Sequence, residues 1–254
     1  MKRRCFLFVI ILFWAVCATI FLFRVKFDLQ TWYHGNTIEV RSPVLYHYDY
    51  LLHFPKRYHD FGNPYPLIIY LHGAGETGKD IRQLKKLDMS YFFNQESFTP
   101  EFQFFVVTPV TPKGGWEPNH IIALLDALLA DQCFRYRIDP NRIYLTGYSM
   151  GGFGTFDTAC AFPDRFAAIV PLAGGGDPGK AEKLMTVPTW AFHGDKDDIV
   201  SCESTEKMIH TMQELHHPNV RMTLLPGFGH AIPPSVYARS DLYQWLLKQK
   251  RIHP

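Results

Sequence analysis

The chain has 254 residues, a formal net charge of +2 and a hydrophobic content of 47%. This length allows one folded domain with a sizeable apolar core. The nearly balanced charge, without a basic stripe, predicts no nucleic-acid partner. Internal repeats and low-complexity tracts are absent from the sequence, which excludes solenoid and repeat architectures.

The N-terminal segment differs in kind from the rest of the chain. Lys2, Arg3 and Arg4 precede an uncharged run over residues 5–23. At about 1.5 Å per helical residue, this run comes close to the ~30 Å hydrocarbon thickness of a bilayer. Two interpretations compete, an uncleaved membrane anchor and a signal peptide that is cleaved near Ala18.

The apolar run continues past Ala18 to Phe23, which favours the anchor. Most of the positive charge precedes the run, which predicts a cytoplasmic N-terminus and an exported domain. We expect an anchor or signal segment over 1–26, a linker over 27–42 and the folded domain over 43–254. The predicted location is a membrane with a single pass and the domain outside the cytoplasm. The alternative is a secreted or periplasmic protein after signal cleavage.

The folded domain contains three cysteines, Cys133, Cys160 and Cys202. An odd number leaves two alternatives, one disulfide with a free thiol, or no disulfide. Cys160 lies in a predicted helix, and we expect it to pack as a small apolar side chain. None of the cysteine spacings resembles a metal site, so no bound metal is predicted.

The domain alternates apolar, β-prone runs with helical patterns. The predicted strands are 44–54 at a sheet edge, 66–71, 104–107, 143–145, 167–172, 189–192 and 220–225. The predicted helices are 121–130, 153–162, 204–215 and 235–248. This alternation predicts an α/β fold with a mostly parallel sheet and helices on both faces. Ligands of such sheets bind outside the carboxyl ends of the strands, so residues that follow strands are the site candidates.

One strand-to-helix junction carries the strongest chemical signal, the segment RIYLTGYSMGG over 142–152. Its β-prone run breaks at Gly147, Ser149 follows, and Gly151 comes two residues later. This G-x-S-x-G pattern between a strand and a helix is typical of a nucleophilic serine on a sharp turn. A β-carbon at position 147 or 151 would clash with the chain passing at close range. The alternative, a glycine-rich turn with a bystander serine, is disfavoured by the strand and helix on either side.

A serine hydroxyl needs a base within hydrogen-bond reach to act as a nucleophile. His72 and His193 each follow a predicted strand and precede a glycine. His230 follows the strand 220–225 across a short glycine-containing loop and precedes a helix. This places His230 at the carboxyl edge of the sheet, where it is the predicted base. The alternative is a histidine on a surface loop.

An acid must hold the imidazole of the base in the correct tautomer and stabilise its charged form. Four carboxylates lie on loops that follow late strands, Asp177, Asp195, Asp197 and Asp198. Each would complete the chain order serine, acid, histidine that α/β-hydrolases use. Spacing alone does not choose among the four.

The chain resembles the α/β-hydrolases, in particular the small esterases that include dienelactone-hydrolase-like and feruloyl-esterase-like enzymes and proteins labelled predicted peptidases. The resemblance covers about residues 43–248 and rests on the segments 71–78 (LHGAGETG), 139–144, 147–152, 163–168 and 193–200. In such proteins the acid sits three residues after the glycine in H-G-x-x-D-x-x-V, which implies Asp197 here. The short loops between the predicted strands indicate no large lid domain.

Acyl transfer also requires an oxyanion hole, whose donors point at the developing negative charge. One donor is the backbone N–H of Met150, the residue after the predicted nucleophile. The second belongs to the loop after the strand 66–71, where the resemblance implies Ala74, with Gly73 as the alternative. A phosphate-binding loop is another interpretation of these glycines, but the Walker spacing is absent and Lys79 is not followed by Ser or Thr.

Together these residues predict a carboxylesterase-type serine hydrolase that forms an acyl-enzyme on small or aromatic acyl esters. The predicted chemistry uses neither a cofactor nor a metal, and the predicted partners are a small-molecule ester and a membrane. Trp116, Phe153 and Phe228 are candidates for an acyl or aromatic pocket, with core or rim packing as the alternative. A serine peptidase of the same fold and a non-catalytic binding module are the other functions considered. No acidic site for a substrate amino terminus is recognisable, and the presence of serine, acid and histidine argues against the module.

Overall fold

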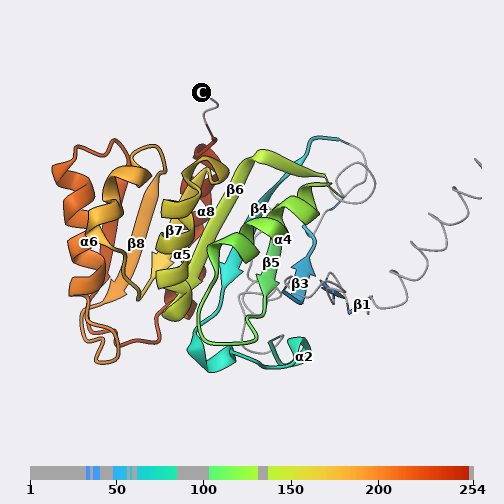
Figure 1. The fold of residues 1–254 in the computed structure, drawn as a ribbon, viewed down its shortest axis with the longest axis horizontal. Helices are drawn as coiled ribbons and strands as arrows, with labels where there is room; N and C mark the ends of the chain where they lie inside the picture. The colour runs from blue at the N-terminus through green and yellow to red at the C-terminus, as the bar shows by residue number, and fades with distance from the viewer. Residues whose placement is uncertain are drawn as a thin grey trace, which may run out of the picture.

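The computed structural model of the chain describes residues 33–34, 37–40, 48–55, 58, 62–84, 103–130 and 137–251. The described strands form one nine-stranded sheet in the order β1-β2-β3-β5-β4-β6-β7-β8-β9 (Figure 1). Strands β4 to β9 pair in parallel, whereas β1, β2 and β3 pair antiparallel with their neighbours. The prediction of a mostly parallel sheet is confirmed.

The described elements alternate along the chain as a doubly covered sheet requires. The strands are β1 (Tyr33–His34), β2 (Thr37–Val40), β3 (Tyr50–His53), β4 (Tyr65–Leu71), β5 (Phe105–Pro109), β6 (Ile138–Tyr148), β7 (Ala168–Leu172), β8 (Thr189–Gly194) and β9 (Val220–Leu225). The α-helices are α2 (Ile81–Leu84), α4 (Pro118–Ala130), α5 (Met150–Ala161), α6 (Glu203–Glu214), α7 (Pro233–Tyr237) and α8 (Ser240–Lys248). Short 3-10 helices are η1 (Ala74–Glu76), η3 (Pro163–Arg165) and η4 (Pro178–Leu184). No lid domain is inserted in the described part of the chain.

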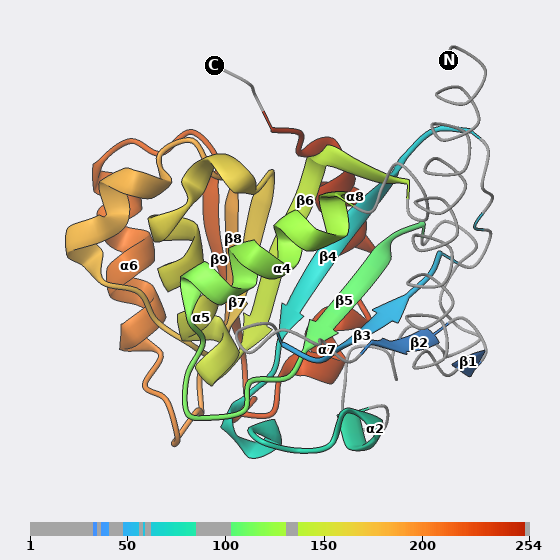
Figure 2. The same cartoon turned by 45° about the vertical axis from the view of Figure 1, so that its right-hand side comes forward.

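Both faces of the sheet are buried, in two separate apolar cores. Leu67 and Ile69 of β4 pack in one core with residues of α4, α5 and α6. Ile68 and Tyr70 pack in the other with residues of α7 and α8. Figure 2 shows α4, α5 and α6 in front of the sheet and α7 and α8 behind it. Because successive side chains point to opposite faces, a strand covered on both sides needs an unbroken apolar run.

The N-terminal part of the sheet differs from the prediction. Strands β1 and β2 lie within the predicted linker over 27–42, so the sheet begins before residue 43. The segment predicted as an edge strand contains β3, which pairs with β2 on one side and with β5 on the other. It is therefore an internal strand, and its edge position is taken by a hairpin that the sequence pattern did not indicate.

The predicted helix over 235–248 is two helices, α7 and α8, separated at Ala238 and Arg239. Arg239 has an extended backbone, and its guanidinium binds the carboxylate of Asp241. The Tyr243 hydroxyl donates to the Tyr237 carbonyl oxygen at 2.8 Å. A side-chain donor therefore replaces a backbone N–H of a continuous helix, which lets the chain turn between α7 and α8.

The predicted location is wrong. In the described ranges of the chain, no helix combines the length and the apolar character needed to cross a membrane. The uncharged run over 5–23, on which the prediction of a single-pass anchor depended, lies outside the described residues.

The cysteines that the structure describes are free thiols. Cys160 of α5 is buried in the core, as predicted, and Cys202 is partly exposed at the start of α6. Burial raises the pKa of the Cys160 thiol to about 11, so it is protonated and unreactive at neutral pH. Cys133 lies outside the described residues.

The junction of β6 and α5 depends on two glycines. A β-carbon on Gly147 would lie 2.3 Å from the carbonyl oxygen of Gly151. One on Gly151 would lie 1.9 Å from the carbonyl oxygen of Leu71 in β4. Both obstacles are backbone atoms and cannot rotate away, so only glycine lets β4, β6 and α5 approach this closely.

We expect Gly151→Ala to lower the free energy of unfolding by about 3 kcal/mol or more, because overpacking against a fixed backbone forces the strand or the helix to shift. Urea unfolding followed by circular dichroism measures this. Gly114→Ala is the matched control, since nothing lies within 4 Å of a β-carbon there. Equal unfolding midpoints for the two variants would contradict the close approach.

Candidate active site

The predicted functional residues lie on loops at one edge of the sheet, where the parallel strands end and η1 and α2 are found (Figure 2). Ser149 follows β6, Asp197 follows β8 and His230 follows β9. The loop with Gly73 and Ala74 follows β4. Four different βα connections thus converge at the place where parallel sheets bind their ligands.

Ser149 lies at the tip of the turn with a left-handed backbone, φ 56°. Its carbonyl oxygen accepts the first bonds of α5, from Gly152 N at 2.8 Å and Phe153 N at 3.1 Å. Its own N–H donates to the Leu172 carbonyl of β7 at 2.9 Å. Ser149 is the N-cap residue of α5, yet its side chain makes no capping bond. The hydroxyl is therefore free to face the histidine.

The structure brings Ser149, His230 and Asp197 into one hydrogen-bonded chain. The Nε2 atom of His230 lies 2.9 Å from Ser149 Oγ, and its Nδ1 lies 2.7 Å from Asp197 Oδ2. Because a carboxylate only accepts, Nδ1 carries the hydrogen and Nε2 is left to accept from the serine hydroxyl. The side chain of Asp197 is fully buried, and that of His230 is 16% exposed.

Both oxygens of the Asp197 carboxylate are occupied. Oδ1 accepts the backbone N–H groups of Ile199 at 3.0 Å and Val200 at 2.9 Å. Oδ2 faces His230 and also the Nε2 atom of a second histidine, His193, at 3.1 Å. Burial alone would raise the pKa of Asp197, but the hydrogen bonds from His230, Val200 and Ile199 outweigh it and hold the pKa below its ordinary value. The carboxylate is therefore charged at neutral pH.

The other three candidate acids have different partners. Asp195 accepts the backbone N–H of Gly227 at 2.6 Å and so ties its loop to the loop before His230. Asp177 caps η4 by accepting from Gly179 N at 3.0 Å. Asp198 is exposed. Of the four, Asp197 alone contacts His230 in the described structure.

Met150 and Ala74, the predicted oxyanion donors, are each the first residue of a helix, where backbone N–H groups have no partner within the helix. The buried His72 orients the Ala74 peptide. Its Nε2 accepts from Thr111 N at 3.2 Å, so Nδ1 carries the hydrogen and donates to the Gly73 carbonyl at 2.7 Å. A trans peptide directs C=O and N–H oppositely, so the Ala74 N–H points away from His72. Burial lowers the pKa of His72 to about 4, which keeps this tautomer at neutral pH.

Trp116 occupies the second of its two predicted positions, packed in the core. Its side chain is buried, its indole Nε1 donates to the His72 carbonyl at 3.1 Å, and its ring lies 4.7 Å from the His72 ring. It packs behind the oxyanion loop. Phe153 and Phe228 are each 39% exposed and flank Ser149 and His230 along the chain.

A third exposed apolar side chain escaped the sequence analysis. Ile199 is 70% exposed, and its backbone N–H holds the carboxylate of Asp197. Ile199, Phe153 and Phe228 each lie within four residues of a member of the hydrogen-bonded chain, and we call them the apolar rim. An exposed isoleucine in the charged stretch KDDIV was the signal available in the sequence.

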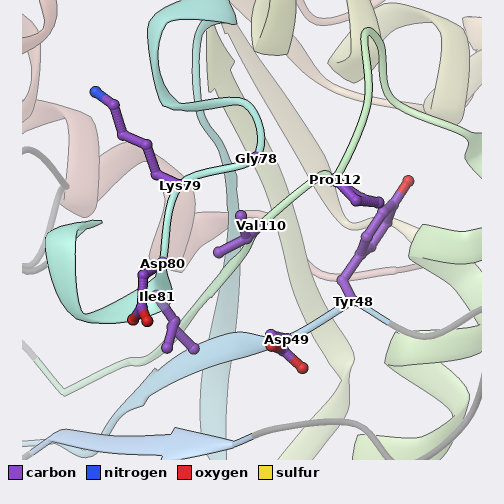
Figure 3. A pocket seen from close by; sticks show the side chains of 8 residues that line it. All are labelled: Tyr48, Asp49, Gly78, Lys79, Asp80, Ile81, Val110 and Pro112. Atoms are coloured by element: carbon purple, nitrogen blue, oxygen red, sulfur yellow. The ribbon is translucent and has the colours of Figure 1, made fainter.

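A separate cavity of about 280 Å³ lies beside the segment that joins η1 to α2 (Figure 3). Its walls are formed by Tyr48, Asp49, Gly78, Lys79, Asp80, Ile81, Val110 and Pro112. The Lys79 side chain extends away from the other lining residues in Figure 3, and the Tyr48 hydroxyl accepts from Glu117 N at 3.2 Å. The cavity shares no lining residue with the hydrogen-bonded chain or the apolar rim.

The described residues contain no recognisable metal-binding site. Among these residues, no group of three or more histidine, cysteine, aspartate or glutamate side chains is arranged to hold an ion. The hydrogen-bonded chain and the helix-start N–H groups are thus the chemical groups gathered at this edge.

Comparison with known proteins agrees with this geometry. A model of the phospholipase/carboxylesterase family matches residues 117–240. A bifunctional acetylxylan esterase/xylanase of Neocallimastix patriciarum is 30% identical over 110 residues, 43% of this chain and 16% of that protein. A probable feruloyl esterase C of Aspergillus terreus is 28% identical over 166 residues, 63% of this chain and 58% of that protein. A solved thermostable esterase has a TM-score of 0.71 and 28% identity, over 85% of this chain and 64% of that one.

The sheet, the serine turn and the likeness to the thermostable esterase show that the chain has the α/β-hydrolase fold. Over the matched segments the chain is similar to carboxylesterases and to feruloyl esterases. The resemblance seen in the sequence is confirmed. The chain spans less than two thirds of the length of each relative named above.

We expect Asp197→Asn to lower kcat for ester hydrolysis by about 10⁴, because an amide does not stabilise the imidazolium and favours the wrong tautomer of His230. Steady-state assays with p-nitrophenyl acetate measure this. Asp198→Asn is the matched control in the same loop, and it should stay close to wild type because Asp198 is exposed. A large loss in Asp198→Asn with an active Asp197→Asn would overturn the assignment of the acid.

Proposed function

We propose that the protein hydrolyses carboxylic esters through an acyl-enzyme on Ser149. The observation that carries the proposal is the continuous chain from Ser149 Oγ through His230 to the buried Asp197, with contacts of 2.9 Å and 2.7 Å. A nucleophile, a base and an orienting acid in this arrangement are the requirements of acyl transfer. The match to carboxylesterases supports the same reaction class.

In the first half of the reaction, Ser149 Oγ attacks the ester carbonyl carbon while His230 Nε2 takes the hydroxyl proton. The carbonyl oxygen becomes an oxyanion that accepts from the N–H groups of Met150 and Ala74. The tetrahedral intermediate then expels the alcohol, which receives the proton from His230. Asp197 stabilises the imidazolium that exists between the two proton transfers.

In the second half, water replaces the alcohol as the reactant. His230 takes a proton from water as its oxygen attacks the acyl-enzyme carbonyl. The same two N–H groups hold the second oxyanion. Collapse of this intermediate breaks the bond to Ser149 Oγ, which recovers its proton from His230, and the carboxylic acid leaves. This cycle requires neither metal nor cofactor.

On the acyl side of the substrate we propose a small or aromatic apolar group that contacts the apolar rim. Phe153, Phe228 and Ile199 expose 39%, 39% and 70% of their surface. Exposed apolar side chains on the segments that carry the catalytic residues gain from covering an apolar substrate group. The names of the relatives, a feruloyl esterase and an acetylxylan esterase, are consistent with aromatic and small acyl groups.

The two alternative functions have less support. A peptidase that trims substrates from the amino terminus needs a carboxylate beside the nucleophile to bind the ammonium group. Glu76 lies in η1, the 3-10 helix that begins at Ala74, but its side chain pairs with Lys79 at 3.9 Å. A non-catalytic binding module has no need of a serine held in a strained turn and aligned with a histidine and a buried acid.

We expect Ser149→Ala to abolish hydrolysis of p-nitrophenyl acetate and butyrate, since removal of a triad nucleophile typically costs about 10⁶ in kcat. The variant should fold, because the Ser149 side chain caps no helix. Circular dichroism verifies the fold, and labelling of the wild type by a fluorophosphonate verifies the reactive serine. Substantial activity in a folded, pure Ser149→Ala protein would refute the proposed function.

We expect Phe228→Ser to lower the preference for butyrate over acetate esters by about three- to tenfold in kcat/KM, because two methylenes lose an apolar contact. Leu215→Ser is the matched control, with 42% exposure against 39% and a position at the end of α6. The ratio of the two kcat/KM values cancels any loss of folded enzyme. An unchanged ratio in Phe228→Ser would remove that residue from the acyl site.

A further inference from the structure

A second histidine lies behind the triad acid. His193 of β8 is fully buried, and its Nε2 atom lies 3.1 Å from Asp197 Oδ2 and 2.9 Å from the Val200 carbonyl oxygen. Its Nδ1 atom lies 2.7 Å from Thr205 Oγ1. Thr205 Oγ1 also contacts the carbonyl oxygen of Gly174 in the loop after β7. His193 thus joins the acid loop, the start of α6 and the loop after β7.

The atoms that face His193 Nε2 show that this nitrogen carries the imidazole hydrogen. A backbone carbonyl and a carboxylate oxygen both only accept hydrogen bonds, so a nitrogen that faces both must be a donor. The Nε2–H of His193 is therefore shared between Val200 O and Asp197 Oδ2. As a result, Asp197 Oδ2 accepts from two histidines, His230 on the substrate side and His193 on the sheet side.

We propose that His193 is a positioning residue of the esterase reaction, whose Nε2–H holds Asp197 Oδ2 in place and takes up part of its negative charge. The proposal rests on the proposed function, because it assigns His193 a role through the triad acid. A carboxylate has about four lone-pair sites. The donors Ile199 N, Val200 N, His230 Nδ1 and His193 Nε2 fill them, so the carboxylate has no freedom to rotate away from His230.

The charge effect has a definite sign. With His193 in place, Asp197 shares its charge between two imidazole donors and attracts the His230 imidazolium less strongly. Without the His193 donor, the carboxylate charge acts on His230 alone and stabilises the imidazolium, which is the inactive form of the base. Loss of the donor should therefore move the acid limb of the kcat/KM profile to higher pH.

The other titratable groups near His230 are unchanged in every variant that tests the shift of the acid limb. They are Tyr148 of β6, whose ring lies 4.9 Å from the His230 ring, Glu76 of η1 near Tyr148, and Asp195 in the acid loop. Burial raises the pKa of Tyr148 to about 12, so this group stays uncharged throughout the assay range. A difference between variants in the acid limb therefore reports on His193.

The test compares two substitutions of similar length. His193→Gln can place an amide N–H near the position of Nε2, whereas His193→Met offers no donor. We expect His193→Met to lose about ten- to a hundredfold in kcat/KM and its acid limb to move up by about one pH unit, the effect of one hydrogen bond to a charged group. His193→Gln should stay within about threefold of wild type with an unmoved limb. Where His193→Met does not fold, His193→Asn takes its place, because its short side chain does not reach Asp197.

His217→Leu is the matched control for a lost buried histidine. His217 is also buried and contacts the Leu184 and Val187 carbonyls at the opposite end of β8. We expect it to lower stability in urea without moving the acid limb. An unmoved limb in His193→Met, or equal profiles for His193→Met and His193→Gln, would overturn the proposal. Either result, with Ser149→Ala inactive, would leave the proposed function intact, whereas an active Ser149→Ala would refute the proposed function itself.

Discussion

The contact between the serine turn and the end of β4 is the constraint on which the site depends. Gly147 and Gly151 have no side chain at the points where β6, α5 and β4 would otherwise collide. Because these two positions carry no side chain, the N–H of Met150 at the start of α5 can lie beside the loop that carries the N–H of Ala74. The two oxyanion donors come from segments more than seventy residues apart, and only this close approach brings their helices to one place. The strained φ of Ser149 is stabilised by the same packing.

Much of the fold follows from local sequence. The central strands contain mostly apolar runs, which is typical of strands buried on both faces, and these runs indicated where the strands lie along the chain. The serine turn was predictable because glycine is required at two fixed positions around Ser149. His230 was indicated by its place after a strand. Asp197 was not, since four acids shared the same topology and only the family resemblance separated them.

The remaining features depend on contacts that sequence spacing does not encode. Strand β3 is internal because a hairpin from the N-terminal side covers it, and the helix over 235–248 divides because Tyr243 reaches back to the Tyr237 carbonyl. For Trp116 the sequence left a pocket and the core open, and its contact with the His72 carbonyl behind the loop decides for the core. The roles of His72 and His193 follow from which atoms face their ring nitrogens. Both histidines precede a glycine after a strand, and that shared pattern marked their position without revealing their partners.

The two buried histidines, His72 and His193, have the same role on opposite sides of Ser149: each binds a loop carbonyl and so orients a group of the site. His72 directly follows β4, and His193 is the last residue but one of β8, so both lie where the chain leaves the sheet. His72 takes up the Gly73 carbonyl and thereby aims an N–H group, whereas His193 takes up the Val200 carbonyl and thereby aims a carboxylate. A loop held this way needs few residues of its own, because a side chain from the rigid strand supplies the missing hydrogen bonds. The loops that carry Ala74 and Asp197 can therefore be short and still hold their groups in place.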